Sequence, residues 1–263
     1  MFKVSVVSVV SMCLLALMTA VPVSAKMITK DVEYKDGDTV LQGYLAYDDA
    51  FMGKRPGVLI IHEWNGLGKY VRRRAGQIAS LGYIAFCADI YGKGIRPKTQ
   101  DESSKTADIY KNDRQLMRSR ATAGLREMNN QANVDQSKLA VMGYCFGGGV
   151  ALELARSGAD VLGVVCFHGN LDTPNPADAK NIKAKILVLQ GADDTYTRDS
   201  IPAFKKEMED ANVNYKLIEY PGAVHGFTNP RNGNDNSKGI AYNKKADERS
   251  WQAMKDFYEM IFK

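Results

Sequence analysis

A cysteine flanked by glycines stands at a position suited to nucleophilic chemistry. The segment Gly143-Tyr-Cys145-Phe-Gly147 matches the pattern G-x-C-x-G, follows an apolar run and opens a helix-like stretch. Such spacing predicts a tight strand-to-helix turn, because the flanking glycines let the two elements approach closely. The N-terminus of a helix also favours a thiolate over a thiol. Two hypotheses stay open here: Cys145 is a nucleophile, or it is an inert residue in a glycine-rich turn.

An acid and a base follow two later apolar runs. Asp194 ends the segment Gly-Ala-Asp-Asp after ILVLQ, and His225 lies in Pro-Gly-Ala-Val-His after KLIEY. The order nucleophile, acid, histidine along the chain is that of α/β-hydrolases. We predict that His225 accepts the thiol proton and later activates water, while Asp194 orients the imidazole. The alternative acid is Asp193, whose expected role is to cap a turn.

A further loop after an apolar run is expected to complete an oxyanion hole. It reads His62-Glu-Trp-Asn-Gly. We predict that the backbone amides of Trp64 and Phe146 bind the developing oxyanion. Glu63 in the same loop could be solvated or could pair with a nearby arginine.

The other histidines and cysteines are expected to be structural. His62 has no catalytic task if His225 is the base, and His168 is expected to be a hydrogen-bonded loop residue, with a place in the pocket wall as the alternative. Cys87 and Cys166 lie inside apolar runs, which is typical of small core residues.

The apolar runs that precede these residues predict an α/β protein. Alternating polar and apolar residues over 31–47 predict an antiparallel hairpin. Continuous apolar runs then alternate with helical patterns, which indicates a mostly parallel sheet with helices on both faces. Strands are expected at 57–62, 83–90, 138–144, 161–169, 184–191 and 215–222, and helices at 70–81, 101–130, 146–156, 199–211 and 244–262. The carboxyl ends of such strands meet at one edge, where binding sites collect.

Residues 1–25 read as a secretory signal peptide. Lys3 gives the positive start, a long apolar run follows, and small residues before Lys26 offer a cleavage site. A retained membrane anchor is the competing interpretation, but helix-breaking Pro22 favours removal. We therefore expect a single domain over residues 26–263, exported to the periplasm or secreted, without stable membrane insertion.

Composition narrows the function classes. The chain has 263 residues, is 45% hydrophobic and carries a net charge of +5, which becomes +4 once Lys3 is removed. No dense basic tract with interleaved aromatics supports nucleic-acid binding. Three cysteines remain after cleavage, an odd number that argues against a disulfide framework. No cluster has zinc-ligand spacing and no phosphate-binding loop is present, so neither a metal nor an organic cofactor is expected.

Five segments together resemble the dienelactone hydrolase family of α/β-hydrolases. They are IIHEWNGLGKYVRRRA, FCADIYGKG, VMGYCFGGG, LQGADD and YPGAVHGF, and the similarity extends in order from Asp31 to the C-terminus. The resemblance implies a Cys145–His225–Asp194 triad that cleaves a small carboxylic ester or lactone through an acyl-thioester. It also implies that Glu63 contacts the resting cysteine, whose thiol would stay protonated until substrate moves the carboxylate.

The substrate-binding segments depart from this family. Its members hold the substrate carboxylate with two arginines, but here the matching segments read Asp-Ile-Tyr91-Gly-Lys93 and His225-Gly-Phe227-Thr-Asn. Lysine is a less geometrically selective substitute for arginine. Tyr91, Lys93 and Phe227 are the expected substrate contacts, with core packing as the alternative for the aromatic residues Tyr91, Phe227 and Trp64. The departure argues against dienelactone itself as the physiological substrate.

Two other functions fit the same residues. A peptidase or thioesterase could use the same triad, and a catalytically silent binding or redox-sensing protein could use a free Cys145. The sequence indicates no oligomeric state.

Overall fold

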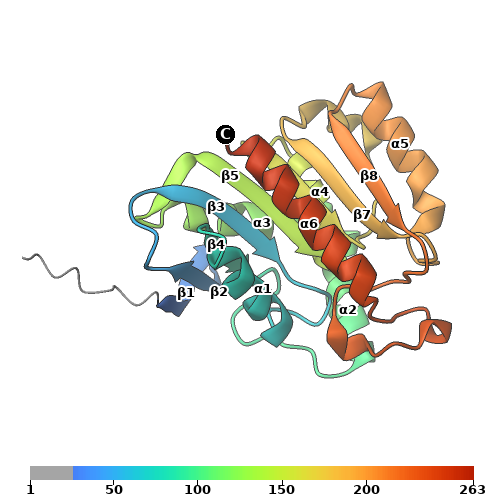
Figure 1. Cartoon of the computed structure of the whole chain (residues 1–263), viewed down its shortest axis with the longest axis horizontal. Helices are drawn as coiled ribbons and strands as arrows, with labels where there is room; N and C mark the ends of the chain where they lie inside the picture. The colour runs from blue at the N-terminus through green and yellow to red at the C-terminus, as the bar shows by residue number, and fades with distance from the viewer. Residues whose placement is uncertain (1–25) are drawn as a thin grey trace, which may run out of the picture.

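One mixed sheet positions all the residues singled out above. The computed structural model describes residues 26–263, so the expected signal peptide at 1–25 lies outside the described residues. In this part of the chain the strands form one sheet in the order β1-β2-β4-β3-β5-β6-β7-β8 (Figure 1). The hairpin β1–β2 and the pair β2–β4 are antiparallel, and the remaining pairs are parallel. The strands are β1 (Met27–Asp36), β2 (Thr39–Asp48), β3 (Arg55–Ile61), β4 (Ile84–Ala88), β5 (Val134–Tyr144), β6 (Gly163–Phe167), β7 (Lys185–Gly191) and β8 (Tyr215–Tyr220).

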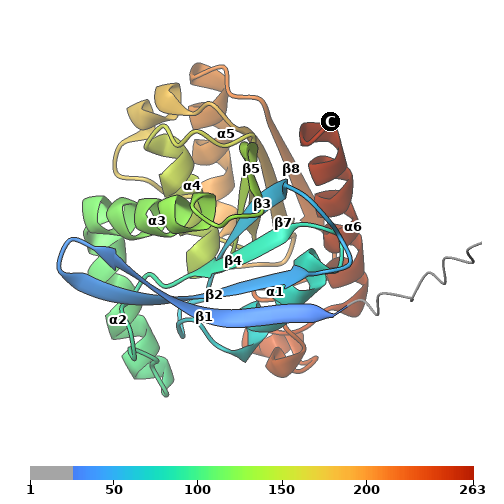
Figure 2. The ribbon, with the colours of Figure 1, turned by 90° about the vertical axis from the view of Figure 1, so that its left-hand side faces the viewer.

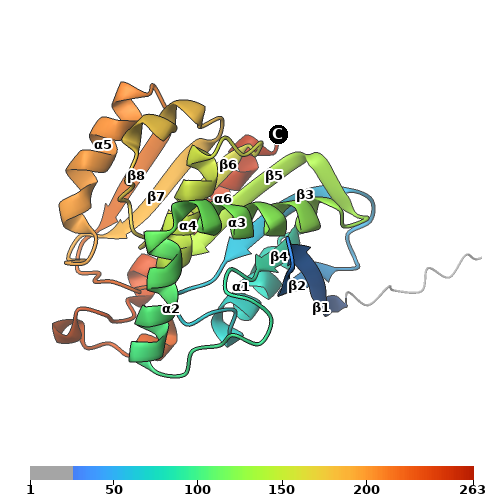
Figure 3. The ribbon, with the colours of Figure 1, turned by 180° about the vertical axis from the view of Figure 1, so that it is seen from behind.

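Helices cover both faces of the sheet. Helices α1 and α6 lie on one face (Figure 1), and α2, α3, α4 and α5 lie on the other (Figure 3). Figure 2 shows the three layers from the β1 edge. The helices are α1 (Lys69–Ala79), α2 (Gln100–Asn112), α3 (Arg114–Asn129), α4 (Phe146–Arg156), α5 (Ile201–Asp210) and α6 (Lys244–Ile261), with short 3-10 turns η1 (Pro176–Asn181), η2 (Arg198–Ser200), η3 (Pro230–Asn232) and η4 (Asn236–Lys238). The predicted α/β-hydrolase fold is confirmed.

The long helical region expected over 101–130 is helical but not continuous, because the chain forms two helices that meet at Asp113. This residue leaves the helical conformation at φ −124° and ψ 86°, and its Oδ1 accepts a hydrogen bond from the Leu116 amide at 2.9 Å. Aspartate is a preferred N-cap because its carboxylate satisfies a free amide of the first turn. The cap therefore starts α3 afresh and lets α2 turn away.

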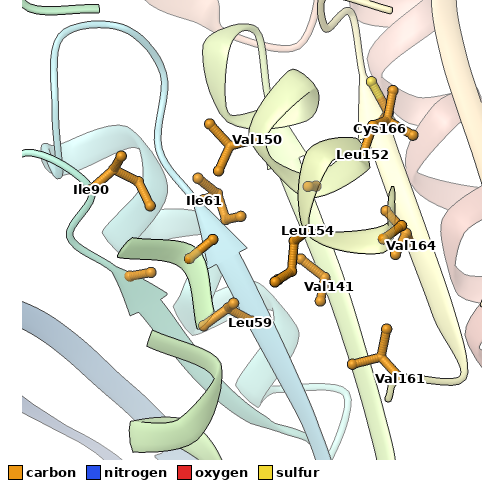
Figure 4. Packing of buried hydrophobic residues seen from close by; sticks show 14 of the residues in the cluster. Leu59, Ile61, Ile90, Val141, Val150, Leu152, Leu154, Val161, Val164 and Cys166 are labelled. Atoms are coloured by element: carbon orange, nitrogen blue, oxygen red, sulfur yellow. The ribbon is translucent and has the colours of Figure 1, made fainter. Parts of the chain in front are cut away.

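The core consists of two hydrophobic clusters, one on each face of the sheet. Figure 4 shows the cluster under α4, where Ile61 of β3 lies near Val150 of that helix. The alternate side chains of β3 point into the cluster under α1 and α6. A strand buried on both faces needs apolar residues throughout, which explains the continuous runs in the sequence. Cys87 and Cys166 are fully buried, as predicted for core residues.

A buried ion-pair cluster fixes the helix that follows the cysteine. The guanidinium of Arg156 donates to both carboxylate oxygens of Glu207 on α5, at 2.7 and 2.8 Å, and to Glu153 at 3.0 Å. Its remaining contact is the Leu171 carbonyl at 2.9 Å. A buried charge is tolerated only where it is paired in this way, so the cluster ties α4 firmly to α5.

Within residues 26–263, none of the helices combines the length and apolar character that a membrane span requires.

Candidate active site

Cys145 occupies a strained turn between β5 and α4. Its backbone has φ 54° and ψ −119°, a conformation that costs a non-glycine residue about 1–3 kcal/mol. A Cβ atom added to Gly143 would lie 1.9 Å from the Gly147 carbonyl oxygen, and one added to Gly147 would lie 2.4 Å from the Ile61 carbonyl oxygen. The two flanking glycines therefore permit the close approach of strand and helix, as their spacing predicts.

The structure brings Cys145, His225 and Asp194 together at the carboxyl ends of three parallel strands. The cysteine Sγ lies 3.1 Å from His225 Nε2, and His225 Nδ1 lies 2.8 Å from Asp194 Oδ2. The other oxygen of Asp194 accepts a hydrogen bond from the Tyr196 amide at 2.9 Å. Asp194 is fully buried whereas Asp193 is exposed. An ionised Asp194 keeps the imidazole proton on Nδ1, which leaves Nε2 free to accept the thiol proton.

The charges around His225 favour its protonated form. Burial alone lowers the pKa of this imidazole, but negative charge on Cys145 and the hydrogen bond to Asp194 outweigh burial and hold the pKa well above its usual range. His225 is therefore suited to accept and hold a proton at this position.

Two backbone amides lie where an oxyanion hole is expected. Phe146 is the first residue of α4, so its N–H has no partner within the helix. The Glu63 carbonyl accepts hydrogen bonds from His62 Nδ1 at 2.7 Å and from the Gly66 amide at 3.1 Å. Because N–H and C=O point in opposite directions in a trans peptide, the Trp64 N–H points away from these partners. Within the described chain, neither the Trp64 nor the Phe146 amide has a hydrogen-bond acceptor.

Glu63 lies beside the cysteine but bonds to another residue. Its carboxylate is 7% exposed, and Oε2 accepts a hydrogen bond from Asn229 Nδ2 at 3.0 Å. In the described chain no hydrogen bond joins Glu63 to the Cys145 thiol, which is hydrogen-bonded to His225 instead. Burial raises the pKa of Glu63 to about 7, with the Asn229 bond as the largest opposing effect. The charge of this carboxyl group therefore changes in the neutral range.

A cavity of about 290 Å³ connects these groups. Cys145, His225, Glu63 and Trp64 all line it, so a substrate bound there would meet the thiol, the imidazole and the oxyanion-hole loop together. The remaining walls come from Asn65, Lys111, Asn170, Tyr196, Gly226, Asn229, Asn232 and Ile240.

Comparison with known proteins identifies the family of this chain. The model of the dienelactone hydrolase family matches residues 41–262. The chain belongs to the dienelactone hydrolase family. The resemblance seen in the sequence is thereby confirmed, and the chain is a hydrolase of the ester and lactone class.

Solved structures and sequence relatives agree with this assignment. A structure called m3DLH is 35% identical, with a TM-score of 0.85 over 90% of this chain and 99% of the other. A dienelactone hydrolase-like promiscuous phosphotriesterase from metagenomic libraries is 36% identical, with the same TM-score and coverage. A Saccharolobus solfataricus protein provisionally named carboxymethylenebutenolidase is 26% identical over 89% of this chain and 99% of its own length.

The three expected substrate contacts of this family member need correction, because none of them lines the cavity. Tyr91 is 2% exposed, and its hydroxyl donates to the Trp64 carbonyl at 2.7 Å. Lys93 pairs with Glu33 of β1. Phe227 is fully buried against other aromatic rings. Tyr91 thus holds the loop that carries Trp64, and Lys93 and Phe227 take no part in the cavity wall.

The other two histidines, His62 and His168, hold the loops beside the site in place through hydrogen bonds. The Ile90 amide donates to His62 Nε2 at 3.2 Å, which places the His62 proton on Nδ1, and burial lowers its pKa to about 4. His168 is fully buried and lies 2.7 Å from the Thr228 hydroxyl, which is 2.6 Å from the Tyr70 hydroxyl. These bonds anchor the segment after His225, so His168 has the structural role expected of it.

Several residues that line the cavity were not predicted from the sequence. Lys111 comes from α2, Tyr196 follows Asp194 by two positions, and Asn229 follows His225 by four. The positions of Tyr196 and Asn229 beside recognised motifs were an available signal, whereas Lys111 lies on a helix whose end the sequence misplaced. In the range 26–263, no group of three or more histidine, cysteine, aspartate or glutamate side chains could hold a metal ion.

Proposed function

We propose that this protein cleaves a carboxylic ester or lactone with Cys145 as nucleophile, His225 as general base and acid, and Asp194 as the residue that orients the imidazole. The observation that carries the proposal is the hydrogen-bonded series from Sγ through His225 to Asp194, at 3.1 and 2.8 Å, on the wall of the cavity. Family membership supports the bond class, and the strained turn at Cys145 supports its role as nucleophile.

Acylation begins when His225 Nε2 takes the thiol proton while Sγ bonds to the carbonyl carbon. The carbonyl oxygen becomes an oxyanion, which the amides of Trp64 and Phe146 stabilise. The bond to the alcohol oxygen then breaks, and Nε2 returns the proton to that oxygen. An acyl-thioester on Cys145 remains; a lactone leaves its hydroxyl tethered to the acyl chain.

Deacylation uses the same groups in reverse. A water molecule gives a proton to His225 Nε2, and its oxygen attacks the thioester carbonyl carbon. The C–S bond breaks, the acid leaves, and the proton on Nε2 returns to sulfur. The free enzyme is restored without a cofactor.

Alkylation of the thiol is expected to stop hydrolysis. Cys145 is partly accessible, while Cys87 and Cys166 are fully buried, so iodoacetamide should modify Cys145 selectively. We expect hydrolysis of 4-nitrophenyl acetate by residues 26–263 to fall in proportion to the fraction of Cys145 modified, as measured by peptide mass spectrometry. Full activity in protein carrying one alkyl group on Cys145 would rule out the proposed nucleophile.

The same assay separates the competing functions. A peptidase or thioesterase would prefer amide or thioester substrates to the aryl ester, and a phosphotriester should be included because of the activity of the metagenomic relative. A binding or redox-sensing protein would hydrolyse none of them while Cys145 oxidised reversibly.

We further propose that Glu63 controls the reactivity of the thiol. Below pH 7 its carboxyl group is neutral; above pH 7 it is ionised and disfavours a second negative charge at Cys145. Glu63→Gln removes this charge and keeps an acceptor for Asn229. Above pH 7 we expect the variant to react with iodoacetamide about tenfold faster than the natural protein, the effect of one pKa unit, and below pH 6 at the same rate. An unchanged pH profile of alkylation would disprove control by Glu63.

We also propose that residues 1–25 are removed and that the protein is exported. The composition of this segment supports export. The first described strand begins at Met27, directly after Lys26, the first residue expected after cleavage. Protein isolated from its source cells should begin at Lys26 and occur outside the cytoplasm.

A further inference from the structure

A second cavity, of about 460 Å³, adjoins the cavity at Cys145. The two cavities share the side chains of Trp64, Asn65, Asn232 and Ile240. An extended molecule whose carbonyl lies at the thiol can therefore reach from the first cavity into the second. The outer walls come from residues 97–103 at the start of α2 and from the segment that holds η3 and η4, both of which lie at the lower edge of the molecule in Figure 3.

The second cavity is lined by cations and by no carboxylate. Lys98, Arg231 and Lys238 form part of its wall, and its other lining residues are uncharged. Across residues 26–263, neither Lys98 nor Arg231 has an ion-pair partner, and Lys238 has only Asp235 at 3.7 Å, where both groups are largely exposed. Exposed pairs of this kind contribute little. The charge of the cavity is therefore largely uncompensated.

The surroundings reinforce this positive charge. Arg231 also lines a smaller cavity of about 170 Å³. The walls of this cavity include Lys69 and Arg73 and no acidic residue. The nearby carboxylate of Glu102 accepts a hydrogen bond from the Lys98 backbone amide at 2.7 Å, and it does not line the second cavity. Concave surfaces lined by one sign of charge attract ligands of the opposite sign.

We propose that the second cavity is a subsite for a carboxylate at the far end of one arm of the ester substrate, with Lys98 and Arg231 as its main contacts. The inference rests on the proposed function and names a substrate class for it: esters of an ω-carboxylated acid or alcohol. Lys93, the cation first expected to bind substrate, is paired with Glu33 outside both cavities. Because Lys98 and Arg231 lie away from the reacting carbonyl, they act on binding, so their loss should raise KM and leave kcat nearly unchanged.

The test compares esters that differ only in the charge at the far end. The mono-4-nitrophenyl esters of succinate, adipate and suberate would each be assayed against the same ester with its free carboxylate methylated. A second pair would carry the charge on the alcohol arm: the acetate ester of 6-hydroxyhexanoate and its methyl ester. We expect the charged partner to be preferred by about fivefold in kcat/KM for the longer arms, which is the upper end of what one exposed charge pair contributes, and we expect no preference for succinate, whose arm is short.

Charge variants locate the effect. Lys98→Gln and Arg231→Gln should each remove most of the preference, through a higher KM for the charged esters. Lys105→Gln is the matched control, because Lys105 lies on α2 shortly after Lys98, pairs with Asp101 and does not line the cavity. Equal rates for charged and methylated esters on both arms, or an equal loss in Lys105→Gln, would overturn the subsite. Absence of 4-nitrophenyl acetate hydrolysis would instead refute the proposed function.

Discussion

Cys145→Ala is expected to lower kcat/KM for 4-nitrophenyl acetate by about 10³-fold or more, because it removes the atom that forms the covalent intermediate. The oxyanion-hole amides and His225 would remain, so a small residual rate through direct attack of water is expected. The substitution removes one sulfur atom at the cavity wall. Circular dichroism and the thermal unfolding midpoint should therefore match the natural protein.

Two controls make this result specific. Cys87→Ala changes a cysteine buried on the far side of the sheet from α4, and should leave kcat/KM within a factor of about two while costing some stability through the small cavity created. Cys145→Ser keeps a nucleophile of similar shape but requires deprotonation of a much less acidic group. If Cys145→Ala kept the natural rate with its fold intact, another group would have to be the nucleophile.

The second large effect is expected at Gly143, whose substitution should damage the site and the fold together. A Cβ atom there would lie 1.9 Å from the Gly147 carbonyl oxygen, and a backbone atom cannot move aside as a flexible side chain can. We expect Gly143→Ala to destabilise the protein by about 3 kcal/mol, which lowers the unfolding midpoint by about 10 °C. A displacement of about 1 Å at the nucleophile would in addition lower activity about 100-fold.

Gly76→Ala provides the comparison. Gly76 lies inside α1, and a Cβ atom there would meet nothing within 4 Å. Alanine in a helix interior is favoured over glycine by about 0.5–1 kcal/mol, so this variant should be slightly more stable and fully active. Equal stability and activity in Gly143→Ala would show that the turn at Cys145 does not depend on the close approach of strand and helix.

The sequence predicts where Cys145, Asp194 and His225 lie, because each follows a buried strand. Apolar runs mark the strands of a parallel sheet, and the carboxyl ends of these strands must meet at one edge. This geometry puts Cys145, Asp194 and His225 at the same edge, where both the thiol and the carboxylate lie within hydrogen-bonding distance of His225. The glycines at 143 and 147 add the local signal for the turn.

The substrate pocket is predicted poorly because side-chain direction in loops has no periodicity. Tyr91 and Phe227 stand beside the motifs, yet both are packed into the interior, and an aromatic residue next to a site is equally suited to core and cavity. The actual walls include Lys111 and Ile240, which lie far in sequence from any motif. Their position depends on how α2 and the segment before α6 settle on the sheet. The break at Asp113 was also not predicted from the sequence, because N-capping by Asp113 interrupts a helical pattern that otherwise continues.

The most direct test of the account is the mass of the enzyme during turnover. Residues 26–263 would be mixed with a slowly hydrolysed aryl ester, quenched in acid within the first turnovers and digested for mass spectrometry. We predict one acyl group per chain, on the peptide that contains Cys145, and this group should be labile to hydroxylamine as a thioester is. An acyl group on any other residue, or rapid turnover with no acyl group on Cys145 at any time, would contradict it.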